Sequence, residues 1–337
     1  MGMETLSLEG LIISHPEFQE GLTPVIPTGE IPAHYINRYE AKYEVRCAFC
    51  DNHTPHKKGF TVQMQDGRVA LCGRDCARHY FGDEVADNFE EKLEKQIRRA
   101  SKMNIIQKTL KGIPEAIKAI TPELVRTEEL ALSAVSALSA TFRDSGMTRF
   151  TDSGHFRLKE TRRTWVERED GVGKTKRVPI DTEHTVLEVK AASILRMHGA
   201  PSSGLLCALA DLEFLSRADA SKEFSDIVID RMTDKRAQAI KNINNGLQFL
   251  KLAAQFFTKE NIKALSELAK HVHTTAEKIE LHKRDHGFDL VITPENYIAD
   301  SDYWGGQKKI TRKISSFESI PSVDSILRPL REGANDA

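Results

Sequence analysis

Four of the five cysteines in this 337-residue chain fall within residues 46–82. They form two close pairs, Cys47-x-x-Cys50 and Cys72-x-x-x-Cys76, with 21 residues between the pairs. Zinc takes four soft or borderline ligands in a tetrahedron, and two ligands a few residues apart can bind one ion from a single turn of chain. Clustered cysteines in a chain otherwise poor in them indicate metal binding rather than disulfides. The segment is therefore predicted to bind a metal, and its spacing suits zinc.

The residues between the pairs predict a hairpin followed by a helix. Asp66-Gly67, the strongest short hairpin signal, lies between two alternating runs, and the second cysteine pair enters a helical pattern. A cysteine knuckle, a hairpin and a helix whose first turn supplies the last ligand resemble the treble-clef zinc fingers, over residues 43–82. This resemblance implies one structural zinc ion per chain, with the ligands Cys47, Cys50, Cys72 and Cys76.

A site with four cysteine ligands is closed, so no position remains for water or substrate. The resemblance therefore implies a structural rather than a catalytic ion. Treble clefs include the HNH nucleases, which need a histidine on the first hairpin strand, but here that strand reads GFTVQMQ. A zinc-containing nuclease remains only an alternative. His53, His56 and His79 could replace a ligand, orient one or be solvated, and the sequence leaves their roles open.

Beyond the cysteine segment the pattern is mostly helical. Apolar residues recur at three- and four-residue steps over 93–110 and again over 131–142. Gly112 and Pro114 are predicted to end or kink the first helix. Thr121, followed by proline, is predicted to cap the second.

Two later segments carry the alternating steps of a coiled-coil seam. Residues 240–257 and 262–279 both repeat apolar side chains at steps of three and four. Two such helices joined at Thr258, the predicted cap, most simply form an antiparallel hairpin. Residues 186–199 and 202–218 are predicted to be short buried helices, the second containing Cys207 as a core thiol.

Residues 146–190 change character and predict a β-ribbon with basic side chains. β-branched and aromatic residues become frequent on both sides of a glycine-rich turn. The arginines could bind phosphates while the neighbouring aromatic side chain stacks on a base. Alternatively, the charges could protect an exposed sheet edge from aggregation. The tail sequence YWGGQKKITRK offers a second basic, aromatic segment. The candidate nucleic-acid-binding residues are Arg157, Lys159, Arg162, Arg163, Trp165, Arg168, Lys174, Lys176, Arg177, Lys308, Lys309, Arg312 and Lys313.

Two further motifs do not support a site. The sequence GVGKT, from Gly171, resembles the end of a P-loop but lacks the earlier glycine and the following helix. His282 and His286 have the i, i+4 spacing of metal ligands on a helix, but no acid lies in register with them.

Composition excludes several classes of protein. The net charge is −1, so any nucleic-acid binding must come from a local patch. No run of 18 apolar residues exists to span a bilayer, and the first residues do not resemble a secretory signal. We therefore expect a cytoplasmic protein that does not enter a membrane.

We predict an α+β, mainly α fold that combines a treble-clef module, a helical bundle with a coiled-coil-like hairpin, and a β-ribbon insertion. We expect a non-enzymatic, zinc-binding protein that binds nucleic acid or a nucleic-acid-handling complex through basic surfaces beside a structural zinc finger. The alternatives are a protein-interaction scaffold or inhibitor that uses the helical hairpin, and an enzyme without a visible motif. The predicted segments are an arm (1–36), the zinc module (37–83), helices (84–145), the ribbon (146–190), a bundle (191–286) and a tail (287–337).

Overall fold

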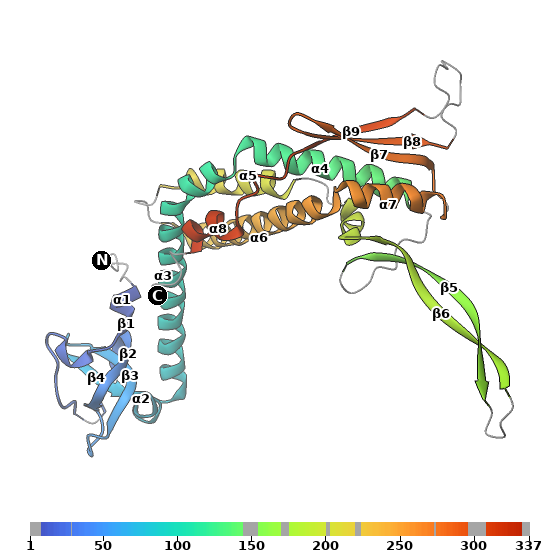
Figure 1. Cartoon of the computed structure of the whole chain (residues 1–337). Helices are drawn as coiled ribbons and strands as arrows, with labels where there is room; N and C mark the ends of the chain where they lie inside the picture. The colour runs from blue at the N-terminus through green and yellow to red at the C-terminus, as the bar shows by residue number, and fades with distance from the viewer. Residues whose placement is uncertain are drawn as a thin grey trace. The chain divides into compact units, whose positions relative to one another are not determined.

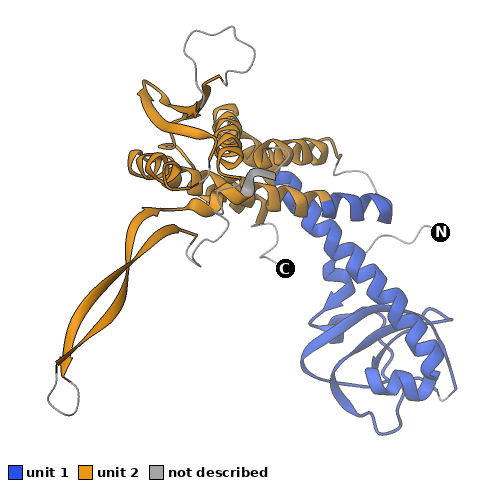
Figure 2. Ribbon diagram, turned by 90° about the vertical axis from the view of Figure 1, so that its right-hand side faces the viewer, with its two compact units in different colours: residues 1–111, 219–234, 333–337 blue, residues 112–218, 235–332 orange. Residues whose placement is uncertain are grey.

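The computed structural model describes residues 8–27, 29–143, 154–169, 175–199, 203–219, 224–272, 274–295 and 308–331. The chain divides into two compact units (Figure 2). Unit 1 comprises Met1–Lys111, Asp219–Asp234 and Gly333–Ala337, and unit 2 comprises Gly112–Ala218 and Lys235–Glu332. Two of the boundaries fall within long helices, one in α3 (Asp83–Ala119) and one in α6 (Asp226–Phe256).

Unit 1 is built on a sheet with the strand order β1-β2-β3-β4 (Figure 1). β1 runs parallel to β2, and the other neighbouring strands are antiparallel. One face of this sheet packs against α2 and α3 through Phe60, Phe81 and Leu93. Besides α3 and α6, the elements are α1 (Leu8–Leu11), β1 (Ile12–Ile13), η1 (Pro16–Phe18), β2 (Pro32–Arg46), β3 (Pro55–Met64), β4 (Val69–Gly73) and α2 (Arg74–Phe81).

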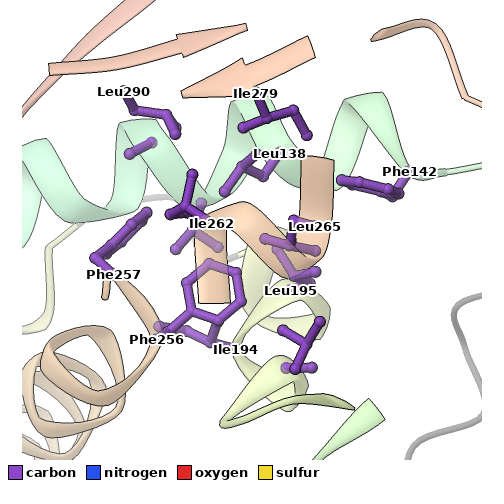
Figure 3. Close-up of a cluster of buried hydrophobic side chains, with 14 of the residues drawn as sticks. Leu138, Phe142, Ile194, Leu195, Phe256, Phe257, Ile262, Leu265, Ile279 and Leu290 are labelled. Carbon is purple, nitrogen blue, oxygen red and sulfur yellow. The ribbon is translucent and has the colours of Figure 1, made fainter. Parts of the chain in front are cut away.

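Unit 2 places a second sheet, β7-β8-β9, against helices α4 and α7. Its core brings together Leu138 of α4, Leu265 of α7, Ile279 of β7 and Leu290 of β8 (Figure 3). The elements are α4 (Pro122–Thr141), β5 (Phe156–Glu169), β6 (Thr175–Val189), η2 (Ala192–Gly199), α5 (Gly204–Ser216), α7 (Lys259–Ala269), β7 (Ala276–Arg284), β8 (Gly287–Pro294), β9 (Ile310–Ser315) and α8 (Val323–Arg331).

Both predicted helix caps are confirmed. The Thr121 hydroxyl accepts a hydrogen bond from the Leu124 N–H at 3.2 Å, with proline in the first turn of α4. The Thr258 hydroxyl accepts from the Asn261 N–H at 3.2 Å and begins α7. Each contact satisfies a backbone donor that the first turn of a helix leaves free.

The prediction of a mainly α fold is wrong. The described chain is 49% helical and 30% strand, with eight α-helices and nine strands in three sheets, so it is a sheet-rich α+β fold. Part of the error lies in residues 186–199, which were predicted to be helical. They hold the end of β6 and the 3-10 helix η2 instead.

The coiled-coil-like hairpin is the second part of this correction. α7 ends at Ala269, and the predicted seam residues Ala276 and Ile279 lie in strand β7. β7 pairs with β8, in residues for which the sequence predicted an irregular tail. Ala276 and Ile279 are both buried although a regular strand alternates its faces at every residue, because the register of β7 shifts between Ala276 and Lys278. This irregularity gives the strand an apolar step of three residues, which in the sequence indicates a helix.

Gly112 and Pro114 do not end α3, which continues to Ala119. A Cβ atom on Gly112 would lie 2.2 Å from the carbonyl oxygen of Pro329. The glycine therefore permits close packing of α3 against α8 within unit 2. Burial of Ile113 and Ala116 in the same turn stabilises the helix at this point.

Candidate metal centre and basic ribbon

Three consecutive elements of unit 1 bring the cysteines together. Cys47 and Cys50 lie in the turn between β2 and β3, Cys72 lies near the end of β4, and Cys76 lies in the first turn of α2. The predicted turn at Asp66-Gly67 joins β3 to β4, with Gly67 at a φ of 90°. This positive φ favours glycine, and it reverses the chain so that the second cysteine pair returns toward the first.

The sulfur atoms of Cys47, Cys50 and Cys76 all lie within 4.8 Å of one another. This group could hold a metal ion. Cys72 is not a member of this group. It has no exposed surface, and its thiol donates a hydrogen bond to the Gly73 carbonyl at 3.4 Å. All five cysteines of the chain are described, and all are free thiols.

Backbone donors surround two of these sulfurs. The Thr54 N–H donates to the Cys50 sulfur at 3.1 Å. Interaction with the Cys72 side chain, followed by interactions with the backbone of Gly73, Phe49 and Cys50, lowers the pKa of Cys47 to about 4. Such donors favour the thiolate, which is the form that binds metals.

The neighbouring cysteines have raised pKa values. Interaction with the Cys47 side chain is the main cause of the increase in the pKa of Cys72, and burial adds to it. Burial raises the pKa of Cys76 to about 12, with further repulsion from Cys47. Deprotonating several of these thiols at once is therefore unfavourable without a cation. A bound cation would lower their pKa values and stabilise the thiolates.

The three nearby histidines are placed outside the group of sulfurs. His53 Nδ1 is hydrogen-bonded to the Cys47 carbonyl at 3.0 Å. His56 is hydrogen-bonded through Nδ1 to the Thr54 carbonyl at 3.1 Å and through Nε2 to the Tyr39 hydroxyl. His79 is exposed on α2. His53 and His56 thus organise the backbone around the cysteine turn.

Sequence reasoning missed Tyr39 and Gly59, which support Cys72 from the neighbouring strands. Tyr39 is 1% exposed, and its hydroxyl donates to the Cys72 carbonyl at 3.4 Å. A Cβ atom on Gly59 would lie 2.2 Å from that carbonyl and 2.7 Å from the Tyr39 hydroxyl. The available signal was a glycine inside a strand pattern, which often marks close approach of another backbone.

In unit 2, β5 and β6 form the predicted ribbon, a two-stranded antiparallel sheet. Four of its basic side chains make cross-strand ion pairs. The Arg163 guanidinium holds the Asp181 carboxylate through two bonds of 2.8 and 3.0 Å and lowers its pKa. The other pairs are Arg157–Glu188 at 2.7 Å, Lys159–Glu183 at 2.8 Å and Arg177–Glu167 at 3.2 Å.

The strand register separates these pairs from the remaining cations. Residues directly opposite each other in an antiparallel pair share a face, and alternate residues lie on the other face. The ion-paired face carries Lys159, Thr161, Arg163, Trp165 and Glu167 of β5 with Arg177, Pro179, Asp181 and Glu183 of β6. The cationic face carries Glu160, Arg162, Thr164, Val166 and Arg168 of β5 with Lys176, Val178, Ile180, Thr182 and His184 of β6.

Arg162, Arg168 and Lys176 make no ion pair with the described residues. Arg168 and Lys176 are directly opposite each other, so two like charges meet with no counter-ion in the described part of the ribbon. The structure thus divides the predicted basic residues of the ribbon into neutralised and unneutralised cations. Lys174 lies outside the described residues.

The second predicted basic segment belongs to a sheet. Arg312 and Lys313 lie in β9, the edge strand beside β8, and Lys308 and Lys309 precede it. Lys313 is directly opposite Asp289 of β8. The aromatic pair Tyr303-Trp304 lies outside the described residues, so the aromatic part of this prediction has no structural description.

The remaining motifs gain no support. His282 lies in β7 and His286 in the turn that follows it, so they do not share a helix face as their spacing suggested. Cys207 is half-buried in α5. Gly171 and the other residues of its motif up to Lys174 lie outside the described chain.

Within the described part of the chain, no helix has the length and hydropathy needed to cross a bilayer. The only group of three or more potential metal ligands found among the described residues is the one formed by Cys47, Cys50 and Cys76. Comparison of the chain with protein-family models, curated proteins and solved structures gave no match.

Proposed function

We propose that this chain is a zinc-containing protein that binds nucleic acid through the cationic face of the β5–β6 ribbon, and that it acts by binding rather than by catalysis. The observation that carries the binding proposal is the separation of cations between the two faces of the ribbon. One face is neutralised by ion pairs, whereas Arg162, Arg168 and Lys176 on the other face have none among the described residues.

In this proposal Cys47, Cys50, Cys72 and Cys76 hold one zinc ion as a closed, structural site of the treble-clef type. The order of turn, hairpin and helix supports it, as do the three clustered sulfurs. Cys72 is the proposed fourth ligand because it is buried in the same side-chain cluster as Cys47 and Cys50, against which Cys76 packs. The ion would stabilise a small module, since metal binding to such sites contributes directly to folding. Thiolate ligands suit a reducing compartment such as the cytoplasm.

The ligand of the cationic face is inferred from charge complementarity. Like charges directly opposite each other in a sheet are destabilising, so the pair formed by Arg168 and Lys176 favours an anion between them. A second copy of the ribbon is a poor occupant. Two ribbons packed face to face would bring two copies of Arg162, Arg168 and Lys176 into one interface, with Glu160 as the acid that each described face offers. A polyanion complements both cationic ends.

A protein partner on the predicted helical hairpin has less support. Its seam residues Ile243, Leu247, Leu250 and Leu265 are buried inside unit 2. A partner could reach them only after local unfolding. The exposed charges of the ribbon need no such rearrangement.

Fluorescence anisotropy with labelled nucleic acid tests the binding proposal. The double variant Arg168→Ala, Lys176→Ala should weaken binding and reduce the slope of log K against log salt by about two, because each lost phosphate contact removes about 0.9 from the slope. The control Lys159→Ala, Arg177→Ala removes the same two charges from the ion-paired face. Equal weakening by both pairs would show that only net charge matters, and absence of binding at low salt would overturn the proposal.

A further inference from the structure

We infer that the nucleic acid on the cationic face is B-form duplex DNA and that the ribbon enters its major groove. This inference rests on the proposed function and adds the kind of nucleic acid and the mode of docking. It follows from the shape of the ribbon and from the side chains that lie between its cations.

The ribbon has the dimensions of a groove-binding element. From Lys159–Thr185 to Glu169–Thr175 the register runs through eleven successive pairs without a shift. Figure 1 shows β5 and β6 as a long twisted ribbon. Among its described residues, the ribbon packs against the core of unit 2 at one end, through Phe156, Leu158 and Leu187. The major groove of B-DNA, about 12 Å wide, admits a two-stranded β-ribbon.

The cationic side chains are spaced to contact separate phosphates. Arg162 and Arg168 are six residues apart on β5, which corresponds to about 20 Å along an extended strand. Lys176 lies opposite Arg168 on the other strand. Cations thus lie at both ends of the cationic face, and at the far end on both strands. A single bound anion could not contact both ends.

The side chains between these cations suit base edges better than base faces. The middle of the cationic face consists of Thr164, Val166, Val178 and Ile180, with no aromatic residue. Binding of single strands depends on aromatic side chains that stack bases. β-branched side chains can instead contact thymine methyl groups in the major groove. Double-stranded RNA is a poorer fit because its deep major groove is too narrow to be read.

The one aromatic residue in the middle of the ribbon provides an internal control. Trp165 is 63% exposed and lies on the ion-paired face, directly opposite Pro179. If single strands were the ligand, this is the position at which a base could stack. If duplex DNA binds to the cationic face, as we infer, Trp165→Ala should leave duplex binding unchanged. Weaker duplex binding by this variant would show that the DNA contacts the ion-paired face.

The experiment compares one sequence as duplex DNA, single-stranded DNA and duplex RNA with the full-length protein. We expect duplex DNA to bind at least about ten-fold more tightly than the others, with a decrease of about 40-fold between 50 and 200 mM salt for three phosphate contacts. Methyl green, which occupies the major groove, should compete with the protein for duplex DNA, and the minor-groove ligand netropsin should not.

The variant Val166→Asp places a carboxylate on the cationic face and should abolish duplex binding. Circular dichroism of the variant checks that its fold is unchanged.

The outcomes separate the two proposals. Binding to none of the three nucleic acids overturns the proposed function and this inference together. Preference for single-stranded DNA or duplex RNA, loss of duplex binding in Trp165→Ala, or competition by netropsin alone overturns the inference of major-groove docking and leaves nucleic-acid binding in place.

Discussion

The backbone N–H of Thr54 donates a hydrogen bond to the sulfur of Cys50 at 3.1 Å. This bond stabilises negative charge on a sulfur that lies within 4.8 Å of those of Cys47 and Cys76. The turn after β2 is therefore already arranged for a thiolate and, with it, for a cation. This relationship connects the local backbone to the proposed zinc site and leads to the first prediction.

Replacing any proposed ligand should release the metal and destabilise the module. Elemental analysis of the purified protein should find about one zinc per chain, and Cys50→Ser, Cys72→Ser or Cys76→Ser should lose most of it. Cys207→Ser in α5 is the matched control and should retain zinc. Full zinc content in Cys72→Ser would remove Cys72 from the ligand set, and a folded wild-type protein without metal would contradict the site itself.

Gly59→Ala should destabilise the same module without removing a ligand. The new Cβ atom would meet the Cys72 carbonyl at 2.2 Å, and this backbone atom cannot move without shifting β4. We expect a loss of about 2–4 kcal/mol in the free energy of unfolding. Thermal unfolding followed by circular dichroism, together with zinc release, measures this.

Gly73→Ala serves as the comparison for Gly59→Ala. Its Cβ atom would lie 3.3 Å from the His56 ring, a side chain that can adjust. Its effect should be clearly smaller. Equal stability of the two variants would contradict the close approach between β3 and β4 at Gly59.

Glu128→Gln should destabilise unit 2. The buried Glu128 carboxylate accepts hydrogen bonds from the Ser203 hydroxyl and from the N–H groups of Gly204 and Leu205, both at 3.0 Å, and so caps α5 from α4. In the glutamine variant the side-chain NH₂ group would face one of these three donors and leave it without an acceptor. We therefore expect the free energy of unfolding to fall by about 2 kcal/mol. Denaturant unfolding measures it, and the exposed neighbour Glu129→Gln should change the stability by less than about 0.5 kcal/mol.

Asn261→Asp should also destabilise unit 2, at the junction of the ribbon with α7. The Asn261 amide donates to the carbonyls of Lys190, Gln255 and Phe256, each at 3.0 Å, and its oxygen accepts from the Lys190 N–H at 3.0 Å. A carboxylate would face three carbonyls, so we expect a loss of about 3 kcal/mol. The exposed Asn245→Asp in α6 is the control, and similar unfolding midpoints for the two variants would argue against this network.

Several features were predictable because their causes are local. The turn at Asp66-Gly67, the position of Cys76 in the first turn of α2, and the caps at Thr121 and Thr258 each depend on residues within about four positions. The β-ribbon was predictable from two β-rich runs around a glycine-rich turn. A single sequence contains all the information that such short-range structures need.

Other features were decided by contacts between residues far apart in the chain. Residues 276–284 could pair with β8 or continue a helix, and the cross-strand partner selected the strand. α3 continues past Gly112 because Ile113 and Ala116 in the same turn are buried, and Pro329 packs closely against Gly112.

The ribbon shows the same division most clearly. The sequence by itself determined that this segment is a hairpin rich in basic residues. Only the tertiary structure, through its strand register, decided that Arg163 is neutralised by Asp181 whereas Arg168 faces Lys176. A one-residue change of register would exchange the two faces, because side chains alternate along a strand and the partner strand sets which charges meet.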